Sequence, residues 1–160
     1  MSSDPHPGRR ALCLGALALA GCGFTPALAP GGNALVLRDR VSVVAPETIP
    51  GFTLRTALQD RLGRGAGPYT LTVALDEALE AAARSRRGDT LRYSLVGVAG
   101  WTLTDADGRA IGTGQVESFT GYAASGSTVA TQTAATDARG RLMTILADRI
   151  VAELTLLDLT

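Results

Sequence analysis

Apolar and polar residues alternate with a period of two in several parts of the chain, and this pattern predicts β-strands. The alternation is clearest from Leu91 to Leu103 and is also present from Tyr69 to Leu75. Residues 35–44 show it as well, with Leu35, Leu37, Val41 and Val43 on one parity. A weaker strand is expected from Ala110 to about Thr120, where Gly112 and Gly114 indicate bulges or close packing. Residues 105–108 form the turn before it, and residues 121–127 are expected to form a loop.

Two other segments carry apolar residues at spacings of three and four, which is typical of helices with one buried side. The first is short, with Thr53 as its expected N-cap and with apolar positions Leu54, Ala57, Leu58 and Leu62. The second ends the chain, and either Ser127 or Thr128 can cap it. Its apolar stripe consists of Leu142, Ile145, Leu146, Ile150, Val151 and Leu154.

Residues 77–87 are ambiguous between helix and strand. Their alanines and glutamates have high helix propensity. A regular strand begins soon after Gly88, however, and a hairpin requires its partner strand to run up to the turn. We favour a long, irregular strand that ends near Arg86.

The predicted order of elements is therefore β-α-β-β-β-α. Each helix has a single apolar stripe, and the sheet has a single strongly apolar face. The simplest packing is an α+β two-layer sandwich, in which a mixed sheet of about four strands carries both helices on one face.

The first 21 residues have the layout of a secretory signal, with Arg9 and Arg10 before a short apolar run and small residues before Cys22. The run of roughly ten residues is too short to cross a bilayer, which needs about 20. The sequence "LAGC" at residues 19–22 resembles the bacterial lipobox. That resemblance implies a lipidated Cys22, acyl chains such as palmitate, and cleavage before the cysteine. The alternative is an ordinary signal peptide with an incidental cysteine.

This interpretation divides the chain into a signal peptide (1–21), a lipidated tether rich in Pro and Gly (22–34) and one folded domain (35–160). The mature chain loses Arg9, Arg10 and Asp4 and has a net charge of about −1, so no overall charge favours nucleic acid. It also loses His6 and Cys13, while Cys22 carries lipid. We therefore expect no Ser–His triad, thiolate nucleophile, His-ligated metal or cofactor.

The order of elements behind "GCGFTPAL" resembles the LptE family of lipopolysaccharide (LPS)-assembly lipoproteins. Other matching features are "FTLRTALQDRLG" (52–63), the hairpin at 84–108, Tyr122 in the expected loop and the final helix. The resemblance implies a non-enzymatic protein that plugs the outer-membrane β-barrel LptD, assists its assembly and takes part in LPS transport. It also implies an outer-membrane location with the domain in the barrel lumen, and Gly23 after the cysteine is compatible with that sorting.

Arg84, Arg86 and Arg87 cluster at the expected hairpin tip, where guanidinium groups can bind the phosphates of LPS. The resemblance implies an LPS contact at Arg86, since family members carry a basic residue at this tip. A solvated basic turn is the alternative. The family's second basic contact lies near the start of the last helix, but "TVATQTAAT" (128–136) contains no basic residue. The chain departs from the family pattern there.

Two other functions fit part of the pattern. One is a lipoprotein component of an ABC-type lipid transport system, which would have a similar size and mixed structure. The other is an enzyme using carboxylates, but Asp105 and Asp107 lie in a turn with Gly108 and are expected to be solvated. Tyr93 and Trp101 lie on the apolar parity and are expected to pack in the core, and the polar parity at Arg92, Ser94, Thr102 and Thr104 suits a wet barrel lumen.

Overall fold

The computed structural model describes residues 36–86, 88, 90–124, 127–157 and 159. The predicted signal peptide and tether lie outside these residues. The elements are β1 (Val41–Val44), α3 (Ile49–Leu62), β2 (Tyr69–Arg84), β3 (Thr90–Thr104), β4 (Ala110–Ala123) and α4 (Thr128–Leu154). This order confirms the predicted β-α-β-β-β-α fold.

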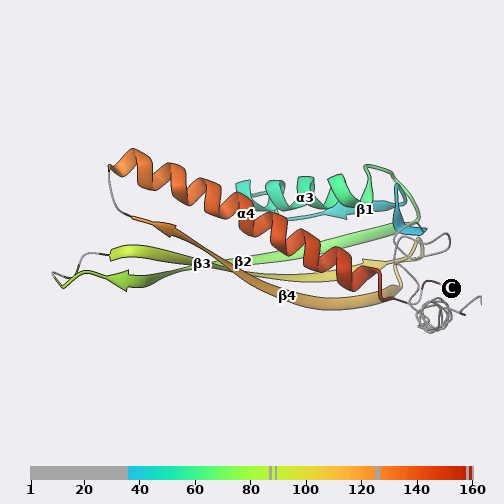
Figure 1. The fold of residues 1–160 in the computed structure, drawn as a ribbon. Helices are drawn as coiled ribbons and strands as arrows, with labels where there is room; N and C mark the ends of the chain where they lie inside the picture. The colour runs from blue at the N-terminus through green and yellow to red at the C-terminus, as the bar shows by residue number, and fades with distance from the viewer. Residues whose placement is uncertain (1–35, 87, 89, 125–126, 158, 160) are drawn as a thin grey trace, which may run out of the picture.

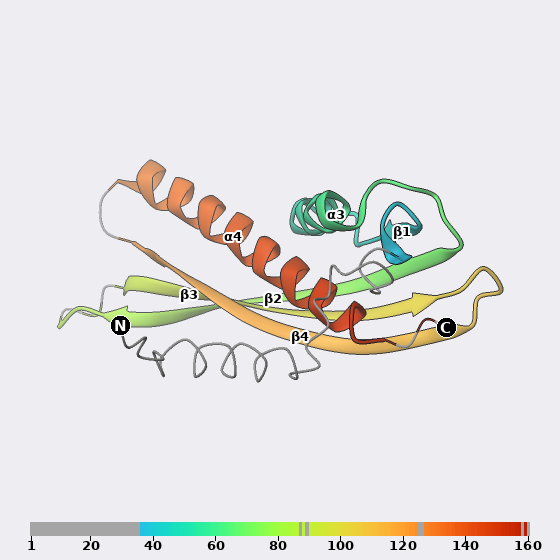
Figure 2. The same cartoon turned by 45° about the vertical axis from the view of Figure 1, so that its right-hand side comes forward.

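The four strands form one mixed sheet in the order β1-β2-β3-β4, with β1 parallel to β2 and the other neighbours antiparallel. Both described helices, α3 and α4, lie on the same face of this sheet, and none of the described residues forms a helix on the opposite face (Figures 1 and 2). The strands β2, β3 and β4 are 16, 15 and 14 residues long, so the described domain is elongated along them.

The core lies between the sheet and the helices, as the alternation predicts. In β3, Leu95, Ala99, Trp101 and Leu103 are buried, while their even-numbered neighbours are half-buried or exposed. Helix α4 contributes Leu142, Leu146, Ile150 and Leu154 from the predicted stripe, together with Met143 and Ala147, which the stripe did not include. Helix α3 crosses the β1 end of the sheet and contributes Leu54, Leu58 and Leu62.

The first predicted strand is wrong over most of its length. Only Val41–Val44 is strand, and residues 36 and 37 form a helical turn. Asp39 has a φ of 57°, a left-handed conformation that a strand cannot contain. Leu37 is fully buried all the same, because the turn folds it into the core. Leu35 lies outside the described residues.

The predicted cap of the first helix is also wrong. Helix α3 begins at Ile49, and Thr48 is its N-cap, with the hydroxyl oxygen accepting from the Gly51 amide at 3.2 Å. Pro50 is tolerated because the amides of the first turn need no intrahelical partner. Thr53 lies one turn inside the helix and donates its hydroxyl to the Ile49 carbonyl at 3.0 Å.

Strand β2 extends to Arg84, which confirms the favoured strand over residues 77–84. Its pairing with β3 shifts between Ala81 and Arg84, consistent with the predicted irregularity. Strand β4 extends to Ala123, so residues 121–123 are strand rather than loop. The reason is a cross-strand pair, in which Tyr122 opposes Tyr93. Ser127, one of the two predicted caps, caps α4 by accepting from the Ala130 amide at 3.2 Å.

Among the described residues, no helix is both long enough and apolar enough to span a membrane.

Candidate interaction surfaces

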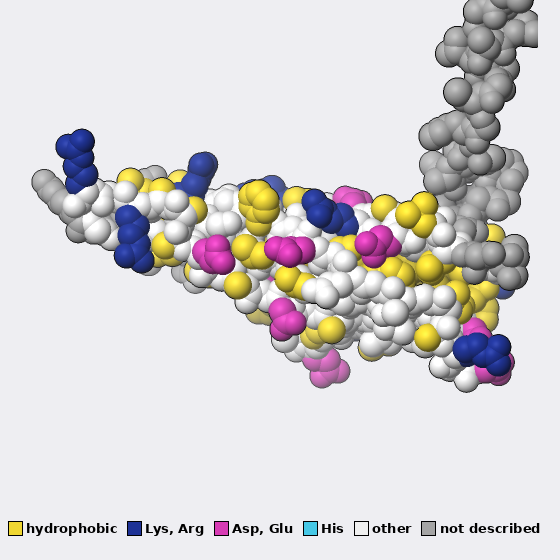
Figure 3. Space-filling model, turned by 90° about the horizontal axis from the view of Figure 1, so that it is seen from below, with side chains coloured by type: hydrophobic (Ala, Val, Ile, Leu, Met, Phe, Trp, Pro, Cys, Tyr) yellow, Lys and Arg dark blue, Asp and Glu magenta, His cyan; other side chains and the backbone are white. Residues whose placement is uncertain are grey.

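The β2–β3 hairpin ends in a basic tip, which we define as Arg84, Arg86 and Arg92. Arg84 is the last residue of β2, Arg86 lies in the turn, and Arg92 of β3 pairs across the hairpin with Ala83. All three are exposed, and none forms an ion pair within the described part of the chain. Figure 3 shows basic side chains at this narrow end of the molecule. The predicted site residues Arg87 and Cys22 lie outside the described residues.

Exposed guanidinium groups can bind phosphate through paired N–H groups. The structure brings Arg84 and Arg86 together with Arg92, which sequence analysis assigned only to the polar face of its strand. The sequence pattern did not specify the register between β2 and β3. In the paired hairpin, Arg92 lies opposite the end of β2.

An aromatic pair lies next to the basic tip on the helix-facing side of the sheet. The rings of Tyr93 and Tyr122 stack, with centroids 5.4 Å apart and planes 25° apart. Tyr93 is half-buried and lies outside the core cluster, so its predicted core position is only partly realised. Leu79 and Leu91 near it are 56% and 46% exposed, because the described helices do not cover this end of β2.

Trp101, by contrast, lies fully in the core, as predicted. Only 4% of it is exposed, and its indole Nε1–H donates to Glu153 Oε2 of α4 at 2.6 Å. The side chain of Trp101 packs against Gly114, where an added Cβ would lie 2.7 Å from Trp101 Cζ2. The suspected role of Gly114 in close packing is therefore confirmed.

The sheet face on which the described residues place no helix is the second candidate surface, which we call the open face. It carries the predicted polar positions of β3 together with the exposed carboxylates Asp76, Glu80 and Glu117. Figure 3 shows acidic side chains over the middle of this face, away from the basic end. Phe119 of β4 also lies on this face and is 71% exposed. Acidic side chains therefore lie mainly over the centre of this view, with basic ones at the tip, along one border and at the opposite end.

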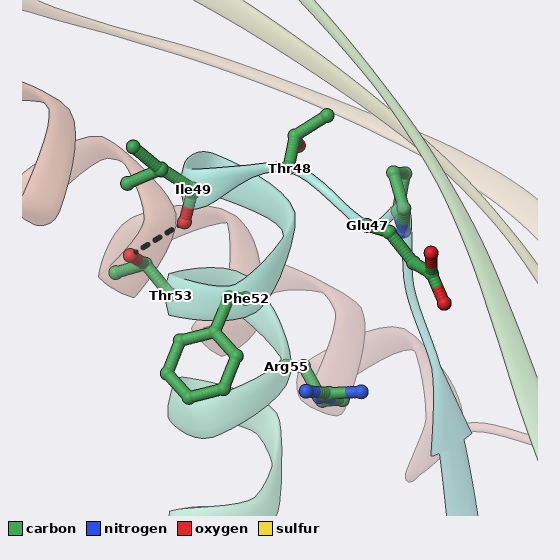
Figure 4. A pocket seen from close by; sticks show the side chains of 7 residues that line it. Glu47, Thr48, Ile49, Phe52, Thr53 and Arg55 are labelled. Carbon is green, nitrogen blue, oxygen red and sulfur yellow. Dashed lines mark hydrogen bonds between the residues drawn. The ribbon is translucent and has the colours of Figure 1, made fainter.

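The N-terminal end of α3 borders a cavity of about 510 Å³. Figure 4 shows its labelled side chains Glu47, Thr48, Ile49, Phe52, Thr53 and Arg55. Glu47 is the single carboxylate among the lining residues, and the Arg55 guanidinium lies 5.1 Å from the centre of the Phe52 ring. The described lining of this cavity therefore contains no carboxylate pair of the kind that glycosidases use.

The predicted turn at residues 105–108 is present, and Asp107 is exposed as expected, but Asp105 is half-buried and has a structural role. The Asp105 carboxylate accepts from the backbone amides of Asp107 and Arg109 at 3.0 and 2.8 Å, and Gly108 has a φ of 78°. The described residues contain no group of three or more His, Cys, Asp or Glu side chains able to hold a metal ion.

These features define an elongated α+β domain with a basic tip and an exposed polar sheet face. Residues 39–154 match the family described as "LptE: Lipopolysaccharide-assembly", and the chain belongs to this family of LPS-assembly lipoproteins. No match was found among curated proteins.

Solved structures similar to this chain are also described as lipoproteins. A putative lipoprotein from Caulobacter crescentus is 25% identical, with a TM-score of 0.60, and the match covers 78% of this chain and 96% of that one. The rare lipoprotein B from Shewanella oneidensis is 13% identical, with a TM-score of 0.55 and coverages of 72% and 92%. A minor lipoprotein from Acinetobacter baumannii is 16% identical, with a TM-score of 0.58 and coverages of 73% and 90%. The last two likenesses support the fold alone.

Proposed function

We propose that this protein is an outer-membrane lipoprotein whose domain occupies the lumen of an LptD-type β-barrel, assists assembly of that barrel and takes part in delivering LPS to the outer leaflet. One observation carries the proposal. A chain of the LptE family places both described helices on one face of its sheet, and the described residues leave the other face uncovered, with charged and polar side chains around Val96, Val98 and Phe119.

The open face suits a water-filled lumen better than a second apolar layer. Its side chains include Asp76, Glu80 and Glu117, whose burial against an apolar wall would be costly. The interiors of outer-membrane barrels are polar, so such a face can contact the wall and remain partly hydrated. The elongated form supports the same role, since the domain can extend along a barrel axis.

The basic tip is the proposed LPS contact, and we propose that Arg87, which follows Arg86 in the sequence, contributes to it. Its three described arginines have no ion-pair partner among the described residues and are free to bind phosphate. The start of α4, where family members supply a second basic contact, offers only uncharged residues at 128–136. Arg92, on the β3 side of the basic tip, is the basic residue that can take over this role.

The proposed anchor is the lipidated Cys22, with residues 1–21 removed and residues 22–34 as the tether to a domain at 35–160. Several acyl chains would hold the protein stably at the membrane, whereas one chain binds only marginally. Mass spectrometry of the native product tests this anchor directly. An unmodified thiol or an intact leader would contradict it.

The proposed action is binding rather than catalysis. The cavity beside α3 has one carboxylate, and the acidic turn uses its Asp105 side chain to bind backbone amides. The role is therefore to occupy the lumen, to stabilise the barrel and to bind LPS, with no bond made or broken.

Depletion of the protein is the test of this function. We expect less folded barrel partner and less surface LPS, and we expect tagged protein to co-purify with a large β-barrel from a detergent extract. Co-purification with an inner-membrane permease complex, together with normal surface LPS on depletion, would instead favour the ABC-type lipid transport system.

A further inference from the structure

Strand β4 is an edge of the sheet, and the hydrogen bonds show which of its backbone groups are unpaired. The Ala124 amide donates to the Leu91 carbonyl of β3 at 2.9 Å. Because antiparallel pairing alternates along a strand, even-numbered residues of β4 bond to β3 and odd-numbered residues direct their N–H and C=O groups outward. The outward-facing residues are Thr113, Gln115, Glu117, Phe119, Gly121 and Ala123.

A side-chain contact supports this assignment independently. Arg149 of α4 reaches over the edge, and its Nη1 donates to the Glu117 carbonyl at 2.5 Å. That carbonyl therefore faces away from β3. In the part of the chain that the structure describes, the sheet ends at β4, and no other strand pairs with this edge.

Apart from Arg149, whose contact with the Glu117 carbonyl an added strand would displace, the described edge lacks the devices that normally keep a free strand from pairing. Strand β4 has 14 residues, no proline, no Lys or Arg, and Glu117 as its single charged residue. Its register with β3 is regular from Gly112 to Ala123. Edge strands of proteins that stay free are usually short, bulged, charged or covered, because unpaired N–H and C=O groups are a template for another strand.

We propose that an extended segment of the barrel partner adds to β4 as a fifth strand of the sheet. This inference rests on the proposed function. A closed barrel has no free strand edge, so the pairing segment must be a loop or a chain end of the partner that enters the lumen.

The charges beside the edge indicate which residues this segment carries. Glu117 on the open face and Arg149 on the helix side are both exposed, and neither forms an ion pair with another described residue. A residue directly opposite Glu117 would lie on the open face, and its sequence neighbours would lie on the helix side near Arg149. The complementary segment therefore has a basic residue opposite Glu117 and an acidic residue next to it. An apolar residue two positions away would cover Phe119.

The test is Gln115→Pro, with Gln115→Ala as its matched control. The Gln115 amide faces outward, so proline removes no bond to β3, and the preceding Gly114 has no Cβ to clash with the ring. Proline does remove one donor from the edge and prevents a strand from pairing there. We expect Gln115→Pro to keep the melting temperature of the wild type and to capture at least tenfold less barrel partner, while Gln115→Ala captures normal amounts.

Hydrogen exchange of the wild-type protein, alone and in the co-purified complex, is the second measurement. We expect the outward amides of residues 113–123 to exchange rapidly in the free protein and slowly in the complex. Normal capture by Gln115→Pro together with unchanged exchange would overturn the inference alone, whereas failure of the wild type to capture any barrel would overturn the proposed function as well. Protection that appears without the partner as protein concentration rises would assign the edge to a second copy and overturn the inference.

Discussion

Trp101 connects the two layers of the domain through one hydrogen bond and one close contact. Its Nε1–H is buried and donates to Glu153, and its ring lies against Gly114. A buried donor that loses its acceptor costs free energy, and an overpacked glycine does too. Two predictions at the scale of single residues follow from this arrangement.

We expect Glu153→Ala to lower the free energy of unfolding by about 1–3 kcal/mol, because the buried indole N–H would lose its acceptor. Glu153→Gln keeps an acceptor and should cost less. Urea denaturation measures both variants. In a Trp101→Phe background, which has no N–H to satisfy, Glu153→Ala should cost much less. An equal cost in both backgrounds would contradict the role assigned to this bond.

Gly114→Ala is also expected to destabilise the fold, by about 1–3 kcal/mol, because its Cβ would lie 2.7 Å from both Trp101 Cζ2 and Glu153 Oε2. Gly100→Ala in the neighbouring strand is the control, since a Cβ there has no atom within 4 Å. The control should change the free energy of unfolding by less than about 0.5 kcal/mol. Because alanine is more favourable than glycine inside a strand, similar losses for the two variants would contradict the contact with Trp101 as their cause.

At the scale of elements, the start of α3 differs from the start that the sequence predicted. The apolar spacing identified the helix correctly, but it placed the cap at Thr53. The position of the cap depends on the connection after β1, which ends at Val44. Residues 45–48 form this connection, and Thr48 at its end is the N-cap.

Thr48→Ala should therefore lower the free energy of unfolding by about 1 kcal/mol, because the Gly51 amide loses its acceptor. Thr53→Ala should be neutral or stabilise the fold slightly, since alanine has the higher helix propensity. Thermal denaturation compares the two variants. A larger loss for Thr53→Ala would return the cap to the position that sequence alone predicted.

The hairpin at β2–β3 illustrates the second limit of local patterns. Residues 77–84 have helical propensity yet form strand, because each of them except Ala82 pairs with a residue of β3. Tertiary pairing outweighs a propensity difference of a few tenths of a kcal/mol per residue. Pairing with β3 likewise extends β4 through Tyr122, where the sequence predicted a loop.

At the scale of the whole molecule, the charges are arranged along the long axis, with the basic tip at one end and acidic residues over the middle of the open face. Such separation orients an anionic ligand at the tip and repels it from the centre. The basic tip is therefore the place where binding of LPS phosphate should be most sensitive to substitution.

We expect the double variant Arg84→Ala/Arg86→Ala to bind purified LPS roughly fivefold more weakly, with the largest difference at low ionic strength, because exposed charges are screened by salt. The double variant Arg38→Ala/Arg109→Ala is the control that removes the same charge, since both side chains are exposed and lie outside the basic tip. Fluorescence titration with LPS measures both. Equal losses in the two variants would mean that net charge, rather than the tip, determines affinity.

The sequence by itself determined the element order, the buried face of β3, the stripe of α4 and the candidate basic tip. Each of these is encoded locally, because period and propensity depend on near neighbours. The tertiary structure alone decided the short β1, the cap at Thr48, the addition of Arg92 to the tip, the bond between Trp101 and Glu153 and the free edge of β4. Each of these depends on the register or packing between segments far apart in the chain, which no local pattern specifies.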